Sequence, residues 1–144
     1  MSAQTQPVLT VYFDGLCKVC SHEIGIYQRR DRAGQVRWVD IMDPHFSAVG
    51  EGLDPTKVHQ EMHAKRRDGQ LAVGVEAFVE IWRVIPGFAP LAVIASQAWT
   101  KPVLRLGYHA FTRIRPFLPR KAAAALGTVT CDDGTCSAKH LSSR

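Results

Sequence analysis

The sequence predicts one domain of the α/β class, in which a strand-helix-strand unit is followed by two strands and a helix. Two runs of strand-forming residues, 8–13 and 36–41, enclose a helical pattern. Two shorter strand-like runs joined by a turn precede another helical pattern at residues 75–84. The chain has 144 residues, of which 46% are hydrophobic and 22% charged, so it is long enough to bury one core without disulfides or metals.

The strand-helix-strand unit has the clearest pattern. Residues 8–13 are β-branched and aromatic, which predicts a buried strand that ends at Asp14-Gly15. The apolar spacing is helical from residue 17 to about 30, and residues 36–41 alternate as a second strand does. Because such a unit has a right-handed crossover, the two strands should be parallel.

The next part is less regular. Residues 43–58 predict a loop with a short helix, which Asp54 caps and Pro55 begins. The elements expected after it are a strand at 60–65, a hairpin turn at 67–70, a return strand at 71–74, and helices at 75–84 and 88–98.

The last third of the chain predicts a long amphipathic helix at residues 100–118 and then a loose tail, because the residues after Pro119 are small and polar. The helically spaced apolar positions are Val103, Gly107, Ala110, Phe111, Ile114 and Leu118. The basic side chains at four-residue steps are Lys101, Arg105, His109 and Arg113. The expected division is a core at about 8–86, a helical extension at about 87–118 and a loose tail at about 119–144.

The order of elements is that of a thioredoxin-like core, and a Cys17-Lys18-Val19-Cys20 pair lies at its first strand-to-helix junction. At a helix start, unpaired N–H groups and the helix dipole favour thiolate, which lowers a cysteine pKa from about 8.5. We therefore predict that Cys17 attacks a substrate disulfide and that Cys20 resolves the mixed disulfide. The expected partners are a disulfide-containing protein or small thiol and an external thiol reductant. Alternatively, the pair is two buried small hydrophobes or half of a zinc site.

Asp14 is a third candidate catalytic residue, and Lys18 and Gly15 are expected to modulate the chemistry. The positive charge of Lys18 should help Cys17 to ionise. Asp14 opposes that ionisation if it is charged and close, or it takes the proton of Cys20 as a general base. Alternatively, Asp14 is a turn residue beside Gly15.

The same residues carry a family resemblance. The DCC thiol-disulfide oxidoreductase family is named for an Asp-x-x-Cys-x-x-Cys motif, which the sequence resembles at Asp14, Cys17 and Cys20. Later segments similar to the family are residues 37–41, 74–78, 81–82, 85–87 and 107–115. The likeness covers about residues 8–118 and implies a thioredoxin-like fold and a redox role.

One feature departs from ordinary thioredoxins and glutaredoxins, which place a cis-proline before the third strand, facing the active cysteine. The equivalent stretch here, residues 58–63, contains no proline, and Pro55 lies too early. Either substrates dock differently against this loop, or the strand lies elsewhere.

A second cysteine pair, Cys131 and Cys136, flanks a strong turn sequence, Asp-Asp-Gly-Thr. Three interpretations are open: adventitious thiols on a flexible tail, a shuttle that exchanges electrons with Cys17 and Cys20, or a zinc-stabilised binding module that uses all four sulfurs. His22 could be a further ligand or tune the thiols, but a histidine on the helix surface is the commoner situation. No metal ligand is assigned.

The sequence gives little support for other enzymatic or binding functions. The sequence has no glycine-rich phosphate loop, Ser-His-Asp pattern or paired carboxylates at catalytic spacing, so no cofactor is expected. A net charge of +5 does not indicate nucleic-acid binding. The basic stripe of the last helix is either a solvated face or a docking face for acidic lipid or an acidic partner, in a protein without redox activity. No bilayer-spanning stretch or secretory signal is found, so a cytoplasmic protein without stable membrane insertion is expected.

Overall fold

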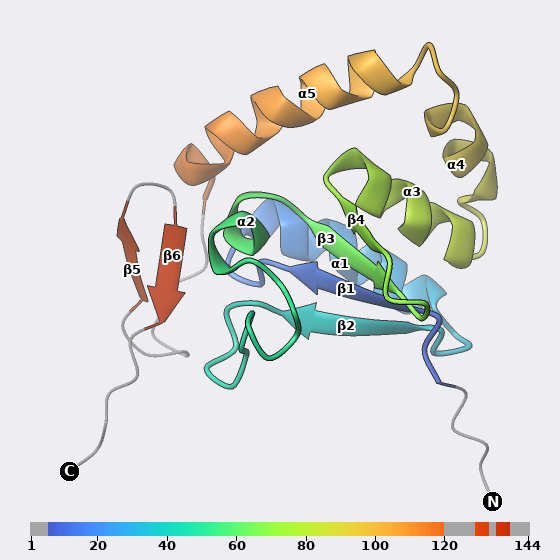
Figure 1. Ribbon diagram of the computed structural model, residues 1–144. Helices are drawn as coiled ribbons and strands as arrows, with labels where there is room; N and C mark the ends of the chain where they lie inside the picture. Colours follow the sequence, from blue (N-terminus) through green and yellow to red (C-terminus); the bar gives the residue numbers. More distant parts are fainter. Residues whose placement is uncertain (1–5, 120–128, 133–134, 139–144) are drawn as a thin grey trace, which may run out of the picture.

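A four-stranded mixed sheet in the order β2-β1-β3-β4 forms the centre of the protein (Figure 1). The computed structural model describes residues 6–119, 129–132 and 135–138. The strands are β1 (Leu9–Phe13), β2 (Val36–Asp40), β3 (His63–Arg66) and β4 (Leu71–Val73). β1 is parallel to β2 and antiparallel to β3, which in turn pairs antiparallel with β4. The parallel pair confirms the predicted crossover unit.

The helices follow the predicted order around this sheet. They are α1 (Lys18–Arg30), α2 (Pro55–Gln60), α3 (Val75–Val84), α4 (Ala89–Ala95) and α5 (Lys101–Ile114), with a 3-10 turn, η1 (Arg115–Phe117), after α5. Asp54 caps α2 through the N–H groups of Thr56 and Lys57, as expected. The α/β fold with β-α-β and then β-β-α order is the predicted thioredoxin-like arrangement.

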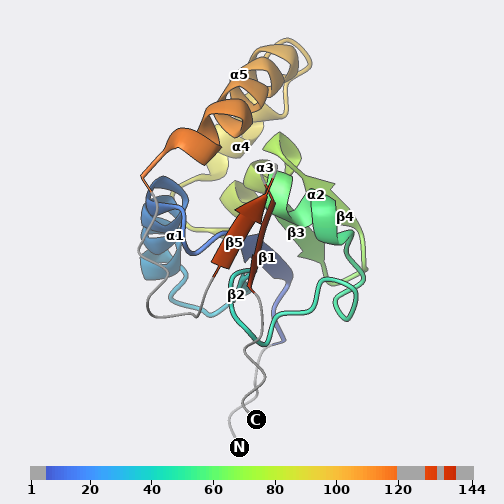
Figure 2. The same ribbon diagram turned by 90° about the vertical axis from the view of Figure 1, so that its left-hand side faces the viewer.

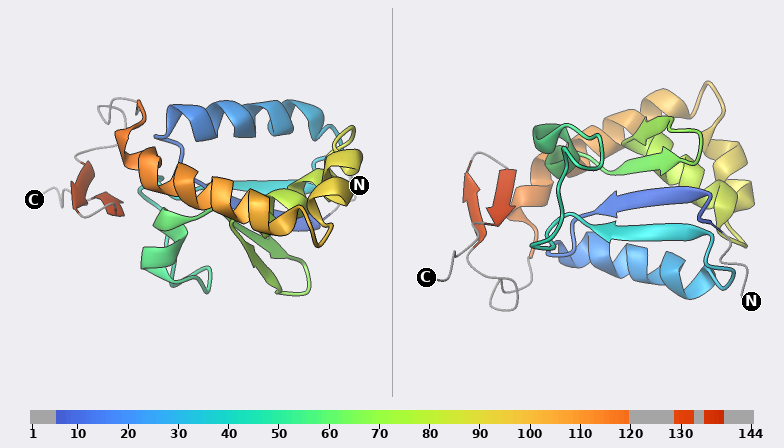
Figure 3. Two further views of the ribbon diagram at one scale, coloured as in Figure 1. Left: turned by 90° about the horizontal axis from the view of Figure 1, so that it is seen from above. Right: turned by 60° about the horizontal axis from the view of Figure 1, so that its bottom comes forward.

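The two faces of the sheet are covered by different segments, because alternate residues of β1 point to opposite faces. Leu9 and Val11 pack with Ile24 of α1 and Ile81 of α3, so these two helices share one face. Tyr12 points to the other face, which residues 41–58 and α2 cover. Figure 3 shows α1 and α2 on opposite sides of the sheet.

The C-terminal helices differ in detail from the expectation. The helix expected at 88–98 is only α4, and the one expected at 100–118 ends at Ile114. Pro116 explains that end, because it has no N–H to continue the α-helical ladder and the chain continues as η1. α5 crosses above α3 and reaches the start of α1 (Figures 1 and 2).

The face that α5 turns toward the rest of the protein is not the predicted apolar stripe. No residue of α5 is buried, and Val103 and Ile114 are 68% and 54% exposed. Leu104, Tyr108 and Phe111 are the half-buried apolar residues of the helix. The side of α5 that contacts the core is therefore rotated about the helix axis from the side that the sequence pattern predicts.

The segment expected to be a loose tail contains paired strands where the structure describes it. β5 (Val129–Asp132) and β6 (Thr135–Ala138) form an antiparallel hairpin. The β-branched residues Val129, Thr130 and Thr135 favour this conformation over an irregular tail. In the part of the chain that the structure describes, no helix is long and apolar enough to cross a membrane.

Candidate active site

The first cysteine pair lies where the end of β1 meets the start of α1. Cys17 is the N-cap residue of α1, with an extended backbone, and its Sγ accepts the N–H of Cys20 at 3.3 Å. This bond occupies one of the donors that a helix start leaves without an internal partner. The sequence therefore places the sulfur of Cys17 at the positive end of the helix, as predicted.

Asp14 shapes the turn that leads into the helix. Its Oδ1 accepts the N–H groups of Leu16 at 2.9 Å and Cys17 at 3.3 Å, and the residue is buried. The turn interpretation of Asp14 is therefore correct. A role for Asp14 in proton transfer stays a prediction.

Gly15 is required by a close approach between two turns. Its N–H donates to Asp40 Oδ1 at 2.9 Å. A Cβ on Gly15 would lie 1.9 Å from Asp40 Oδ2, which is well inside van der Waals contact. Glycine at this position thus lets the turn before Cys17 rest on the end of β2.

Arg115, from η1, is the cation beside the thiols. Its Nη2 donates to Asp14 Oδ2 at 2.8 Å, and the two side chains are only 12% and 5% exposed. Its Nη1 donates to the carbonyls of His59 and Gln60, each at 3.3 Å. One buried guanidinium therefore joins the turn before Cys17, the end of α2 and the C-terminal extension.

These contacts shift the pKa values of the two thiols in opposite directions. The hydrogen bond with the Cys20 side chain, then the Cys20 N–H and the charge of Arg115, lower the pKa of Cys17 to about 6, although burial and Asp14 raise it. The hydrogen bond with Cys17 and burial raise the pKa of Cys20. The pair thus has one sulfur suited to be an anion near neutral pH and one suited to hold a proton.

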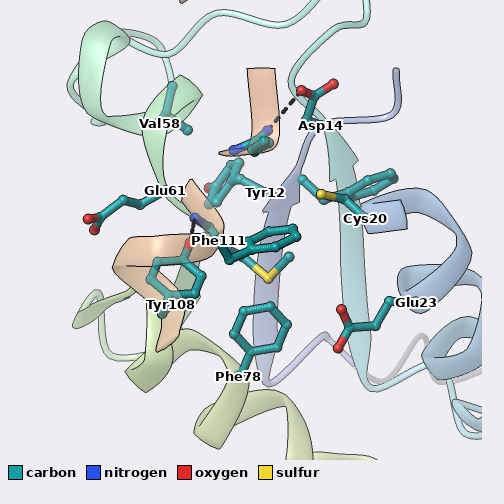
Figure 4. Close-up of a pocket in the computed structure, with 12 residues that line it drawn as sticks. Tyr12, Asp14, Cys20, Glu23, Val58, Glu61, Phe78, Tyr108 and Phe111 are labelled. Carbon is teal, nitrogen blue, oxygen red and sulfur yellow. Dashed lines mark hydrogen bonds and ion pairs between the residues drawn. The ribbon is translucent and has the colours of Figure 1, made fainter. Parts of the chain in front are cut away.

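A small pocket opens on the Cys20 side of the pair (Figure 4). Its lining includes Asp14 and Arg115, and aromatic and acidic side chains from other elements, Phe78, Tyr108, Phe111, Glu23 and Glu61 among them. Cys17 itself is 1% exposed, and Cys20 is 8% exposed. The N–H of Lys18 donates to the carbonyl of Pro119 at 3.3 Å, so the chain after η1 lies against the first turn of α1.

The loop before β3 takes its shape from α5. Tyr108 Oη accepts the N–H of Met62 at 2.8 Å, and Arg115 binds the two carbonyls nearby. No cis peptide bond occurs among the residues that the structure describes. This loop contains no proline, and side-chain hydrogen bonds from α5 and η1 hold it instead.

The other predicted residues have different positions. Lys18 and His22 are exposed on α1, so their effect on the thiols stays a prediction. Among the residues with described side chains, no three His, Cys, Asp or Glu gather to hold a metal ion. Cys131 and Cys136 are register partners across β5 and β6, but their side chains lie outside the described part. The four-sulfur zinc interpretation therefore stays a prediction too.

Arg115 and Tyr108 were not predicted as site residues, although both lie in the family-like segment 107–115. A signal was present, because Leu104, Tyr108, Phe111 and Arg115 follow at steps of four, three and four residues. A charged residue at the end of such a half-buried stripe is typical of a cation with a buried partner. The partner, Asp14, lies 101 residues earlier in the chain, and local pattern carries no information about it.

The fold and site define a thioredoxin-like protein with a dithiol at the start of its first helix. The sequence matches the DCC1-like thiol-disulfide oxidoreductase family over residues 11–121. The chain belongs to this family.

An Arabidopsis thaliana protein described as uncharacterized and chloroplastic is 28% identical over 106 residues, which cover 65% of this chain and 50% of that protein. The chain thus spans half the length of that relative. No solved structure matched the chain.

Proposed function

We propose that the protein exchanges disulfides through Cys17 and Cys20, with Cys17 as the attacking thiolate. The observation that carries the proposal is the position of Cys17 Sγ at the cap of α1, where it accepts the Cys20 N–H. The lowered pKa of Cys17 follows first from the hydrogen bond with the Cys20 side chain, and then from this N–H bond and the charge of Arg115. The membership of the chain in a thiol-disulfide oxidoreductase family supports the reaction class.

The reaction proceeds by two displacements. The Cys17 thiolate attacks one sulfur of a substrate disulfide, forms a mixed disulfide and releases the other sulfur as a thiolate. Cys20 then loses its proton and attacks Cys17, which forms the Cys17–Cys20 disulfide and releases the reduced substrate. Two equivalents of an external thiol, or one dithiol, then restore Cys17 and Cys20 and are themselves joined as a disulfide, so two electrons pass from them to the substrate. The reverse direction uses the same steps.

Asp14 is our candidate base for the second displacement. Its carboxylate and the Cys20 side chain line the same pocket, and its negative charge helps to raise the pKa of Cys20. Because both groups line this one pocket, we propose that the Cys20 proton passes to the carboxylate directly or through one water. Arg115 binds one oxygen of this carboxylate and limits its basicity.

Access to Cys17 requires a local movement, because only 1% of the residue is exposed. The segment that ends at Pro119 is our candidate for the part that moves, since the Lys18 N–H bond to Pro119 joins it to the helix start. A small thiol substrate needs less movement than a protein disulfide does. The substrate is thus expected to be small or to bear an exposed, extended disulfide.

Mass mapping of trapped intermediates tests the proposal. In a Cys131→Ser/Cys136→Ser background, Cys20→Ser should accumulate a mixed disulfide with glutathione at Cys17, and Cys17→Ser should not form one at Cys20. The pH dependence of Cys17 alkylation should show a midpoint near pH 6, as the lowered pKa requires. A midpoint at or above the free-thiol value of about 8.5 would count decisively against the proposal.

A second candidate function rests on the register of the hairpin. Cys131 and Cys136 are directly opposite each other across β5 and β6. Opposite residues of antiparallel strands have Cα atoms about 4.5–5.5 Å apart, within the usual disulfide range of about 4.4–6.8 Å. We propose that this pair closes into a disulfide, which the reduced Cys17–Cys20 pair can reduce in a two-electron exchange.

Peptide mapping during a redox titration tests this exchange. In the full chain, a Cys131–Cys136 disulfide should disappear as Cys17–Cys20 forms, and in Cys17→Ser it should persist. Elemental analysis of the same preparation addresses the zinc alternative. One zinc per chain, with unfolding by a chelator, would replace both redox proposals with a zinc-stabilised module.

A further inference from the structure

Exposed apolar side chains are concentrated on the C-terminal helices. The described residues include eleven exposed large hydrophobics, and eight of them lie between residues 91 and 117. Five of the eight have helical spacing along α5 and its two ends: Trp99 at 74% exposure, Val103 at 68%, Leu106 at 73%, Ile114 at 54% and Phe117 at 88%. We call these five residues the outer stripe.

The outer stripe is distinct from the face that binds the core. Steps of three and eight residues keep Val103, Leu106 and Ile114 on one side of α5, which has 3.6 residues per turn, and Trp99 and Phe117 flank its two ends. Ala110, which is also exposed, fills the long step. The half-buried residues Leu104 and Tyr108 lie on another side. A continuous apolar surface of this kind, with aromatic residues at both ends, is unusual on an isolated soluble domain.

The charge around the outer stripe indicates what would cover it. The sequence contains no Asp or Glu from residue 81 to residue 131. On a helical wheel, Arg113 and His109 follow directly beside Leu106, and both are exposed. Arg105, further round, pairs with Glu76 of α3. The apolar stripe is therefore bordered by the exposed cation of Arg113, and no carboxylate of α5 opposes it.

We propose that α5 docks in the plane of an anionic lipid membrane, with the outer stripe in the lipid interface. An apolar face with Trp and Phe beside a basic flank is the composition of helices that lie on membranes. Trp99 and Phe117 are placed to anchor the two ends. η1 carries both Phe117 and the Asp14 partner Arg115, so docking brings the thiol site close to the lipid surface.

Vesicle sedimentation with the full chain tests this inference. The protein should sediment with vesicles of phosphatidylcholine and phosphatidylserine at low salt, and less with phosphatidylcholine alone. The variant Leu106→Ser/Phe117→Ser should bind about tenfold more weakly or worse, because two large apolar groups no longer enter the interface. Arg113→Gln should weaken binding by about fivefold, and added salt should weaken it further.

The control is a second pair of exposed apolar residues on other elements. Val49 and Leu71 are 75% and 45% exposed, so Val49→Ser/Leu71→Ser removes similar groups and should bind as the unmodified chain does. Absence of binding to anionic vesicles at low salt would overturn the proposal, as would equal loss in both double variants. A concentration-dependent dimer that only Leu106→Ser/Phe117→Ser abolishes would instead assign the stripe to a second copy of the chain. Reduction of a soluble disulfide should be unchanged in Arg113→Gln and in Val49→Ser/Leu71→Ser, whose residues lie outside the site, so failure of docking and failure of the redox proposal are separable.

Discussion

At the scale of single residues, the hydrogen bond with the Cys20 side chain is the main cause of the lowered pKa of Cys17, and two charged neighbours of opposite sign adjust that pKa. The negative charge of Asp14 raises the pKa of Cys17, and the positive charge of Arg115 lowers it. Because Arg115 also binds Asp14 Oδ2, it acts on the thiol directly and by neutralising the group that opposes ionisation. A buried aspartate can therefore lie beside a thiolate without preventing its formation.

Arg115→Gln should raise the pKa of Cys17, because the cation is lost and Asp14 is left without its counter-charge. The midpoint of the pH profile for iodoacetamide modification should move from about pH 6 toward higher pH. At pH 6 the rate should fall several-fold, whereas it should change little above pH 9. Arg113→Gln, an exposed cation two residues earlier, is the matched control and should leave the midpoint in place. An unchanged midpoint in Arg115→Gln would contradict the role assigned to this residue.

Asp14→Asn should have opposite effects on the two displacements. Removing the negative charge should lower the pKa of Cys17 further, since Asp14 raises it. If the carboxylate receives the proton of Cys20, closure of the Cys17–Cys20 disulfide should slow by about a hundredfold. Stopped-flow measurement of glutathione release from the Cys17 mixed disulfide checks the second step. Release at the unmodified rate would leave Asp14 with its turn role alone.

Gly15→Ala should destabilise the fold, because the new Cβ would lie 1.9 Å from Asp40 Oδ2. We expect a loss of about 1–3 kcal/mol in the free energy of unfolding, as for other overpacked sites. Gly107→Ala is the control: its Cβ meets nothing within 4 Å on the surface of α5, and it should stabilise by about 0.5–1 kcal/mol. Urea unfolding of both variants measures the two changes. Equal stability would mean that Asp40 moves aside freely.

At the scale of elements, the local sequence pattern predicted the strands and helices that have clear apolar spacing or typical capping and turn residues. The ends of α1 and α3, the cap of α2 and the turn at 67–70 follow from the residues present there. The side of α5 that faces the core did not follow from its pattern, because contacts with Phe78 and Met62 decide it. For the candidate site, the sequence pattern pointed to Asp14, Cys17 and Cys20, which are close together in the chain, but not to Arg115, which binds Asp14 from 101 residues away.

Tyr108→Phe should weaken the attachment of α5 to the loop before β3. The variant removes the acceptor of the Met62 N–H and leaves that donor without its 2.8 Å partner in a buried residue. A cost of about 1–3 kcal/mol in the free energy of unfolding is expected. Faster hydrogen exchange at the Met62 amide is the specific readout, since a general loss of packing would not single it out. Exchange at Met62 equal to that of the unmodified chain would show that the bond contributes little.

At the scale of the whole molecule, the candidate site is assembled from segments that lie far apart in the sequence. Asp14 and Arg115 are 101 residues apart in sequence, and the Lys18 N–H meets the carbonyl of Pro119. The two main clusters of buried core residues contain no member from α5 or η1. The core can therefore form without the segment that completes and covers the site, and the covering segment can separate from it locally.

A chain that ends at Ile114 should expose Cys17 while it keeps the sheet, both main clusters and the Tyr108 bond to Met62. This truncation removes the Arg115 charge and the Pro119 contact together, whereas Arg115→Gln in a chain that ends at Arg120 removes only the charge, and both of these chains lack β5 and β6. Above pH 9, where Cys17 is a thiolate in either variant, any difference in alkylation rate reports access alone. The truncated chain should react faster with a bulky maleimide by tenfold or more, and by much less with iodoacetamide, since the small reagent needs a smaller opening. Circular dichroism should confirm that the α/β fold is retained. Equal maleimide rates in the two variants would mean that other groups cover Cys17, and the segment ending at Pro119 would lose its assigned role in access.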